Sequence, residues 1–205
     1  MRIKRNCIFG IILLAGLIIV LTNSNIANGQ TVTIDFESLP LSALTKSLKV
    51  TNQFNDKGID FTNATAVDSL TKPEFPHSGR QVIESCFGIE FCTAPIGMTF
   101  TQPQKRVKVW VGFNYQGKYT LYLRAFDKNN KQIVSTKIVK EPLLKVTGVT
   151  TKGILKGSLN YLMYVLEVNA RSNLIVRAEV GLIRPKGVVD TLSVSVDDVE
   201  FERIR

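Results

Sequence analysis

Two adjacent aspartates near the end of the chain are the residues best suited to chemistry. Asp197 and Asp198 lie where the alternation of apolar residues slips, because Val196 belongs to one phase of the strand and Val199 to the other. Such a slip predicts a β-bulge, which re-aims side chains. Carboxylates aimed together suit a hard cation, which prefers oxygen ligands. The alternative leaves both as solvated charges that discourage edge pairing.

Two further carboxylates come from the start of the predicted fold. Asp35 and Glu37 lie at the end of the predicted first strand, Thr31–Glu37. If the first and last strands pair, these side chains come to lie beside the two aspartates of the bulge. Together they would supply the oxygen ligands that a hard cation needs.

A second group of residues suits the binding of a sugar. Trp110, Tyr122, Arg124 and Phe126 alternate with apolar residues and are predicted to share the face opposite the valines of the stretch Lys105–Asp127. Aromatic rings stack on the apolar faces of sugars, and arginine hydrogen-bonds hydroxyl or acidic groups. The alternative is that a second layer of chain covers this face, so that the four residues belong to the core.

That shared face depends on a predicted central β-hairpin. Two alternating runs flank the loop Gln116–Lys118, which has a glycine available for a left-handed position. A three-residue loop keeps both apolar sets on one face. This register sets Val111 opposite Leu123 and Trp110 opposite Arg124.

The remaining reactive residues do not form a catalytic set. His77 is the only histidine of the chain, and a histidine without a partner is weak evidence for a general base. The acidic residues with no other assignment have no spacing that predicts two carboxylates facing one glycosidic bond; they are Asp68, Glu74, Glu84 and Glu90. We therefore predict a protein without enzymatic activity. A degenerate hydrolase is the least favoured alternative.

The pattern of short strands predicts the fold class. About ten strands separated by turn signals, without an amphipathic helix of useful length, are typical of an all-β protein with two antiparallel sheets packed as a β-sandwich. A second hairpin is predicted from the alternating runs Leu162–Val168 and Leu174–Leu182. Residues 30–205 are predicted to form one domain, a length that buries a sizeable core.

Residues 1–29 are interpreted as a cleaved signal peptide. Arg2, Lys4 and Arg5 precede the apolar run Ile8–Leu21, which is short for a bilayer span. An uncleaved membrane anchor is the alternative. We expect a secreted or cell-surface protein with no membrane span after cleavage. Its basic residues form no run that would indicate nucleic acid as a partner.

Two cysteines lie outside the predicted signal peptide, Cys86 and Cys92. In an oxidising compartment the pair is predicted to form a disulfide that closes a short loop. The alternative, a two-thiol metal site, would need further ligands.

Several short motifs occur in an order that resembles a known family of domains. The motifs include TIDFE at 33–37, VKVWVGF at 107–113 and VSVDDVEFE at 194–202. Their order resembles the jelly-roll domains of bacterial secreted surface proteins, which are similar to galactose-binding-like carbohydrate-binding modules. In such modules a calcium ion often ties the first strand to the last. The resemblance therefore implies structural calcium held by Glu37, Asp197 and Asp198.

The residues and the resemblance together predict a secreted, non-catalytic binding or adhesion module. Its expected partner is a glycan or a cell-surface polymer, and its expected ion is structural calcium. The alternative is a purely structural domain of the cell surface or envelope, without a small ligand.

Overall fold

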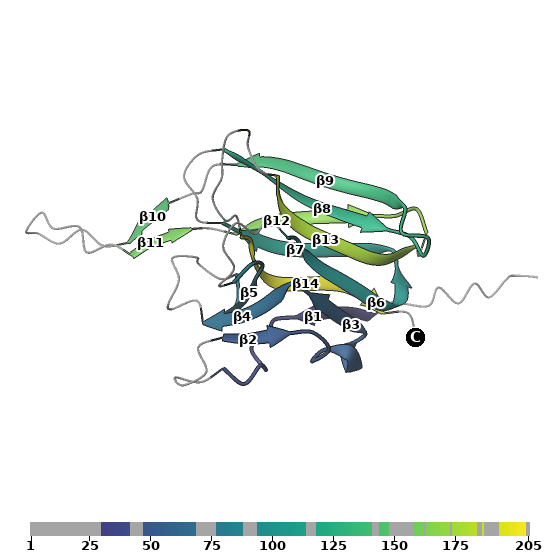
Figure 1. The fold of residues 1–205 in the computed structure, drawn as a ribbon, viewed down its shortest axis with the longest axis horizontal. Coiled ribbons are helices and arrows are strands. Elements are labelled where there is room, and N and C mark those ends of the chain that lie inside the picture. The colour runs from purple at the N-terminus through teal and green to yellow at the C-terminus, as the bar shows by residue number, and fades with distance from the viewer. Residues whose placement is uncertain are drawn as a thin grey trace, which may run out of the picture.

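Two antiparallel sheets make up the molecule and confirm the predicted β-sandwich (Figure 1). The computed structural model describes residues 30–41, 47–68, 77–87, 94–113, 118–140, 144–147, 158–161, 163–172, 174–183, 186 and 193–203. The predicted signal peptide lies outside this range, and its cleavage stays a prediction. Among the described residues, no helix is long and apolar enough to cross a membrane.

The seven-stranded sheet has the order β12-β7-β14-β5-β4-β2, with β1 also paired to β14. Its strands are β1 (Gln30–Ile34), β2 (Ser47–Val50), β4 (Ala64–Asp68), β5 (Gln81–Glu84), β7 (Arg106–Gly112), β12 (Tyr164–Asn169) and β14 (Ser195–Arg203). The five-stranded sheet has the order β3-β6-β13-β8-β9. Its strands are β3 (Ile59–Thr62), β6 (Ile96–Gln104), β8 (Tyr119–Phe126), β9 (Gln132–Lys140) and β13 (Ile175–Ile183).

Two smaller elements complete the described structure. A single 3-10 turn, η1 (Asn55–Lys57), precedes β3 and ends at Gly58, whose φ of 94° favours glycine. The strands β10 (Leu144–Thr147) and β11 (Ser158–Tyr161) pair with each other alone, and their ribbon projects from one end of the sandwich (Figure 1).

The first and last strands pair, and the last strand contains the predicted bulge. β1 lies antiparallel to β14, from Gln30 opposite Arg203 to Ile34 opposite Val199. On its other side, β14 changes register against β7 between Val196 and Val199. Asp197 and Asp198 therefore face a single residue of β7, which is the geometry of a β-bulge.

The core lies between the sheets and follows the predicted alternation. Val107, Val109 and Val111 of β7 are fully buried in it, so Arg106 and Lys108 lie on the outer face of the seven-stranded sheet. At one end of the core, Phe36, Phe54 and Phe61 meet edge to face with centroids 5.5 to 6.1 Å apart. Such contacts fix how the start of the chain packs.

The predicted central hairpin is wrong. β7 lies in the seven-stranded sheet and β8 in the five-stranded sheet, so the chain passes from one layer to the other between them. Val111 is opposite Val196 and Tyr164, and Leu123 is opposite Val180 and Thr136. Apolar alternation did not reveal this, because a hairpin and a crossover between layers both direct the same residues into the core.

The second predicted hairpin is wrong for the same reason. β12 pairs with β7, whereas β13 lies between β6 and β8 in the other sheet. A hairpin that does exist joins β8 to β9. There the Asp127 carboxylate accepts hydrogen bonds from the backbone N–H groups of Asn129 and Lys131, both at 2.9 Å. The turn is therefore held by bonds between near neighbours in sequence.

Candidate functional site

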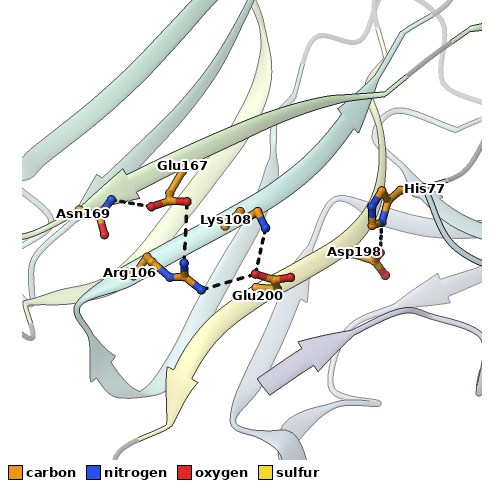
Figure 2. Close-up of polar contacts among 7 residues, drawn as sticks. All are labelled: His77, Arg106, Lys108, Glu167, Asn169, Asp198 and Glu200. Carbon is orange, nitrogen blue, oxygen red and sulfur yellow. Dashed lines mark hydrogen bonds and ion pairs between the residues drawn. The ribbon is translucent and has the colours of Figure 1, made fainter. Parts of the chain in front are cut away.

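The bulge in β14 brings three metal-ligating side chains together. Asp197 and Asp198 are buried, with 0% and 4% of their surfaces exposed. His77 approaches Asp198 from the segment before β5 (Figure 2). One potential ligand atom from each residue lies within 4.8 Å of the other two. We call these three residues the bulge cluster.

Hydrogen bonds hold the cluster but leave one oxygen without a partner. The Nδ1 atom of His77 lies 2.5 Å from Oδ2 of Asp198, and the Ser78 hydroxyl lies 2.9 Å from Oδ1 of Asp198. The backbone N–H of Ser78 donates to Oδ2 of Asp197 at 2.6 Å. The other oxygen of Asp197, Oδ1, is buried and makes no hydrogen bond within the described structure. Such an atom costs free energy unless an ion or water satisfies it.

Burial also changes the acidity of this group. Desolvation raises the pKa of the Asp197 carboxyl from 3.8 to about 7, and the neighbouring Asp198 adds to the rise. The N–H of Ser78 acts in the opposite direction but does not cancel it. The charged form of Asp197 is therefore poorly stabilised by the protein alone, and a cation beside it would favour that form.

Glu37 binds the backbone of the loop that carries His77 and does not join the cluster. Its Oε1 accepts the backbone N–H groups of Arg80 and Gln81 at 2.7 and 2.6 Å. Gly79 is in the left-handed region, with φ at 52°, and a Cβ there would lie 2.2 Å from the Glu37 carboxyl carbon. Glu37 thus fastens the loop that carries His77 to the end of β1. Asp35 accepts the backbone N–H of Glu37 at 3.3 Å and does not reach the cluster.

The calcium set implied by the resemblance is therefore met in part. Asp197 and Asp198 lie together as expected, and the unpartnered oxygen of Asp197 fits a bound cation. Glu37 is not among the residues that converge, and His77 takes the third position instead. Calcium stays a prediction on these contacts. His77 was considered only as a general base without a partner and was missed as a ligand, since Asp198, which it contacts, lies 121 residues away in sequence.

Trp110 lies directly beside the cluster, on the outer face of the seven-stranded sheet. Its ring stacks on that of His77 at 4.3 Å between centroids, and the Lys108 ammonium lies 4.0 Å from the indole centroid. These neighbours leave Trp110 only 8% exposed. Trp110 therefore supports the loop of His77 and is not an open stacking surface.

Ion pairs continue from Lys108 along the same face (Figure 2). Glu200 contacts Lys108 at 3.2 Å and Arg106 at 3.5 Å. Glu167 of β12 extends the chain of contacts, 3.9 Å from Arg106 and 2.7 Å from the amide of Asn169. These side chains are partly exposed, so the network ties β14, β7 and β12 together with modest energy.

The predicted four-residue sugar surface is not formed. Tyr122, Arg124 and Phe126 of β8 lie on the outer face of the five-stranded sheet, whereas Trp110 belongs to the other sheet. Tyr122 is 6% exposed and lies across Gly181, where a Cβ would be 2.8 Å from its hydroxyl oxygen. Burial raises the pKa of the Tyr122 hydroxyl.

On the outer face of the five-stranded sheet, two guanidinium groups stack on aromatic rings. The Arg124 guanidinium lies 4.2 Å from the ring centroid of Tyr122, and that of Arg177 lies 3.9 Å from the centroid of Phe126. Arg177 also pairs with Glu179. Arg124 and Phe126 remain partly accessible, so their predicted role in ligand binding stays a prediction.

An open cavity of about 600 Å³ lies by the edge strand β2 of the seven-stranded sheet, near β4 and the end of β3. Polar side chains that line it are Ser47, Lys49, Thr51, Thr62, Asn63 and Thr65. Phe87, which is 37% exposed, adds an aromatic ring. We call this the Phe87 cavity. Sequence reasoning did not find it, because its residues come from separate segments and share no motif.

Cys86 also lines this cavity and is buried. Cys92 lies outside the described residues, so the predicted pairing of the two stays a prediction. Of the acidic residues considered for catalysis, Glu74 and Glu90 likewise lie outside the described residues. Glu84 is buried in β5, and Asp68 accepts a hydrogen bond from Arg80 at 2.7 Å.

No family model and no curated protein matches this sequence. Among solved structures, the chain is similar to a DUF4465 family protein from Bacteroides caccae, at 11% identity and a TM-score of 0.50, covering 85% of this chain and 100% of that one. It also aligns with the K2 cleaved adhesin domain of Lys-gingipain, at 13% identity and a TM-score of 0.44, covering 83% and 97% of the two chains.

A third alignment is with the CBM22-1 xylan-binding domain of Paenibacillus barcinonensis Xyn10C, at 8% identity and a TM-score of 0.38, covering 86% and 96%. The likeness to the Bacteroides caccae protein extends over most of the chain and shows a shared fold. The chain is thus a two-sheet antiparallel β-sandwich of jelly-roll type that shares its fold with the Bacteroides caccae protein.

Proposed function

We propose that this protein is a secreted, non-catalytic binding module that takes a short glycan in the Phe87 cavity. The observation that carries the proposal is the lining of that cavity. An exposed aromatic ring stands with hydroxyl groups, one amide and one ammonium group around an open volume of about 600 Å³. Ligand pockets commonly enclose roughly 300 to 1,000 Å³.

The lining of the cavity has groups suited to both the apolar face and the hydroxyl groups of a sugar. Phe87 is the exposed aromatic residue of the described lining, and aromatic rings stack on the apolar side of a pyranose ring. Lys49 and Thr65 are opposite each other across β2 and β4, and both can hydrogen-bond sugar hydroxyls. Asn63 is held by its side-chain amide, which donates to the carbonyl of Pro95 at 3.3 Å. Its side-chain oxygen remains an acceptor for a ligand.

The charge of the lining narrows the class of glycan. Lys49 brings a positive charge, and none of the described lining residues is an aspartate or glutamate. A neutral or acidic saccharide is therefore favoured over a basic one. Glycoside hydrolysis generally needs two carboxylates beside the bond that breaks, so this lining supports binding and not cleavage.

A glycan array tests the proposal, followed by calorimetry on any saccharide that binds. The protein should be expressed as the full chain and recovered after export. Phe87→Ala should weaken binding by about tenfold, which corresponds to loss of one aromatic stacking contact. Val139→Ala is the matched control, because Val139 is 62% exposed on β9, away from the cavity. Equal affinity in the two variants would exclude the cavity as the site.

Two other outcomes identify the alternatives. If Arg124→Ala abolishes binding and Phe87→Ala does not, the ligand lies on the outer face of the five-stranded sheet, as the sequence predicted for Arg124 and Phe126. If no saccharide or cell-surface polymer binds, the structural role without a small ligand is the better explanation.

We also propose that a divalent cation binds at Asp197 and Asp198 and stabilises the fold. The support is the buried, unpartnered Oδ1 of Asp197 beside a second buried carboxylate. A cation that binds only the folded state must raise its stability. The measurement is thermal unfolding with and without chelator, and an unchanged midpoint would exclude the cation.

A further inference from the structure

His77 is held against the bulge from two sides. Its Nδ1 lies 2.5 Å from Asp198, and its ring lies flat on Trp110, with 28° between the ring planes. Turning the imidazole away would break both contacts. The nitrogen that faces the two carboxylates is therefore placed by packing against β7.

The atoms that converge are a mixed nitrogen and oxygen set. Besides His77, each aspartate offers a carboxylate oxygen, and the Ser78 hydroxyl lies 2.9 Å from Asp198. Glu37, the third carboxylate of the implied calcium set, accepts two backbone N–H groups with one oxygen. Calcium takes six to eight oxygen ligands. The described donors are too few for that and include a nitrogen.

A borderline divalent cation fits this set better. Zinc binds imidazole and carboxylate ligands in tetrahedral geometry; its structural sites use four protein ligands, and its catalytic sites use three with water in the fourth position. The His77 side chain is 44% exposed, so solvent can reach the site from its side. A cation also supplies the partner that Oδ1 of Asp197 lacks.

We infer that the proposed cation is bound by His77 together with Asp197 and Asp198, and that it is a zinc-like ion and not calcium. The inference rests on the cation proposed above. The stack on Trp110 agrees with it, because an imidazole that carries part of a metal's charge is attracted to the face of an indole ring.

The single histidine makes the test direct. Protein without an affinity tag is stripped with chelator and titrated with Zn²⁺ and Ca²⁺ separately, by calorimetry and thermal unfolding. The imidazole nitrogens are followed by NMR, where every histidine signal belongs to His77. We expect Zn²⁺ to bind more tightly than Ca²⁺, to raise the unfolding midpoint, and to shift the Nδ1 resonance.

His77→Phe is the matched variant, because it keeps an aromatic ring to stack on Trp110 and removes the ligand. It should bind Zn²⁺ at least about tenfold more weakly than the parent. Asp197→Asn should lose binding as well. Equal Zn²⁺ affinity in the parent and His77→Phe, or an unshifted Nδ1 resonance, would overturn the assignment of His77.

The titrations with Zn²⁺ and Ca²⁺ distinguish the proposal of a bound cation from the inference that it is zinc-like. Tighter binding of Ca²⁺, unaffected by His77→Phe, overturns this inference and restores the predicted calcium site. Failure of both ions to bind or stabilise the protein overturns the cation itself. Folding of each variant is checked in chelator, where the inference expects His77→Phe to keep a cooperative transition.

Discussion

The bulge cluster and the Phe87 cavity place polar groups in opposite ways. In the cluster, two carboxylates are buried and contact His77 and Ser78. In the cavity, the groups of Lys49, Thr62 and Asn63 are exposed. Buried charge is costly unless it is satisfied, whereas exposed polar groups are already satisfied by water. The cluster should therefore govern stability, and the cavity should govern recognition.

The largest effect is expected for Asp198→Ala, which removes the carboxylate that His77 and Ser78 contact. We expect a loss of about 2 to 3 kcal/mol in the free energy of unfolding, since hydrogen bonds to a charged group are broken and their partners are left behind. Urea denaturation measures it. Glu202→Ala is the control on the same strand, where the half-buried side chain should cost less. Equal losses of stability in the two variants would show that the cluster contributes no more than another carboxylate of β14.

The pH dependence of stability should reveal Asp197 when no metal is bound. Its folded-state pKa is about 7 against an ordinary 3.8, so the folded protein holds this proton more tightly than the unfolded chain does. Stability in chelator should therefore fall as the pH rises from about 4 to about 7, and the contribution should level off above that range. Asp197→Asn should remove this part of the slope, as measured by urea midpoints at several pH values. A slope unchanged in Asp197→Asn would contradict the assignment.

Gly79→Ala should break the attachment of the loop to Glu37. The new Cβ would lie 2.2 Å from the Glu37 carboxyl carbon, at a backbone with φ of 52°. We expect a loss of about 1 to 3 kcal/mol, together with weaker cation binding. Gly112→Ala is the control, because its Cβ would meet the flexible side chain of Met163 at 3.3 Å. A loss of stability in Gly112→Ala as large as in Gly79→Ala would show that the contact between the loop and Glu37 has no specific role.

The smallest effect on stability is expected in the cavity. Lys49→Ala and Thr62→Ala should change the free energy of unfolding by less than about 0.5 kcal/mol, because both residues are exposed and exposed side chains contribute little. Both should weaken a glycan that binds there. Calorimetric unfolding and ligand titration on the same samples give the two quantities. Variants that unfold easily but bind normally would reverse the comparison between the two regions.

Local pattern was a good guide wherever neighbours in sequence decide the structure. The phase slip between Val196 and Val199 predicted the bulge, because an extra residue must shift the alternation. The turn after Asp127 is likewise held by its own residues, since Asp127 accepts hydrogen bonds from N–H groups two and four positions later. The pairing of β1 with β14 was posed as a condition and is met.

Pattern failed wherever the layers of the sandwich had to be assigned. The buried valines of β7 and the buried leucines of β8 alternate alike, and nothing in that alternation says that they belong to opposite sheets. The predicted sugar surface depended on the predicted hairpin and is wrong for the same reason. It grouped Trp110 with residues of β8, which lies in the other sheet. The Phe87 cavity was missed because its lining comes from separate segments.

The sequence by itself determined the strand content, the bulge and the presence of two carboxylates within it, because each depends on the order of neighbouring residues. Only the tertiary structure decided which side chains complete the site. His77 meets Asp198 across 121 residues of chain, since Glu37 fastens its loop and Trp110 supports its ring. In the folded protein, Glu37 accepts hydrogen bonds from the backbone, and His77 is a candidate metal ligand. Packing between distant strands assigned those roles.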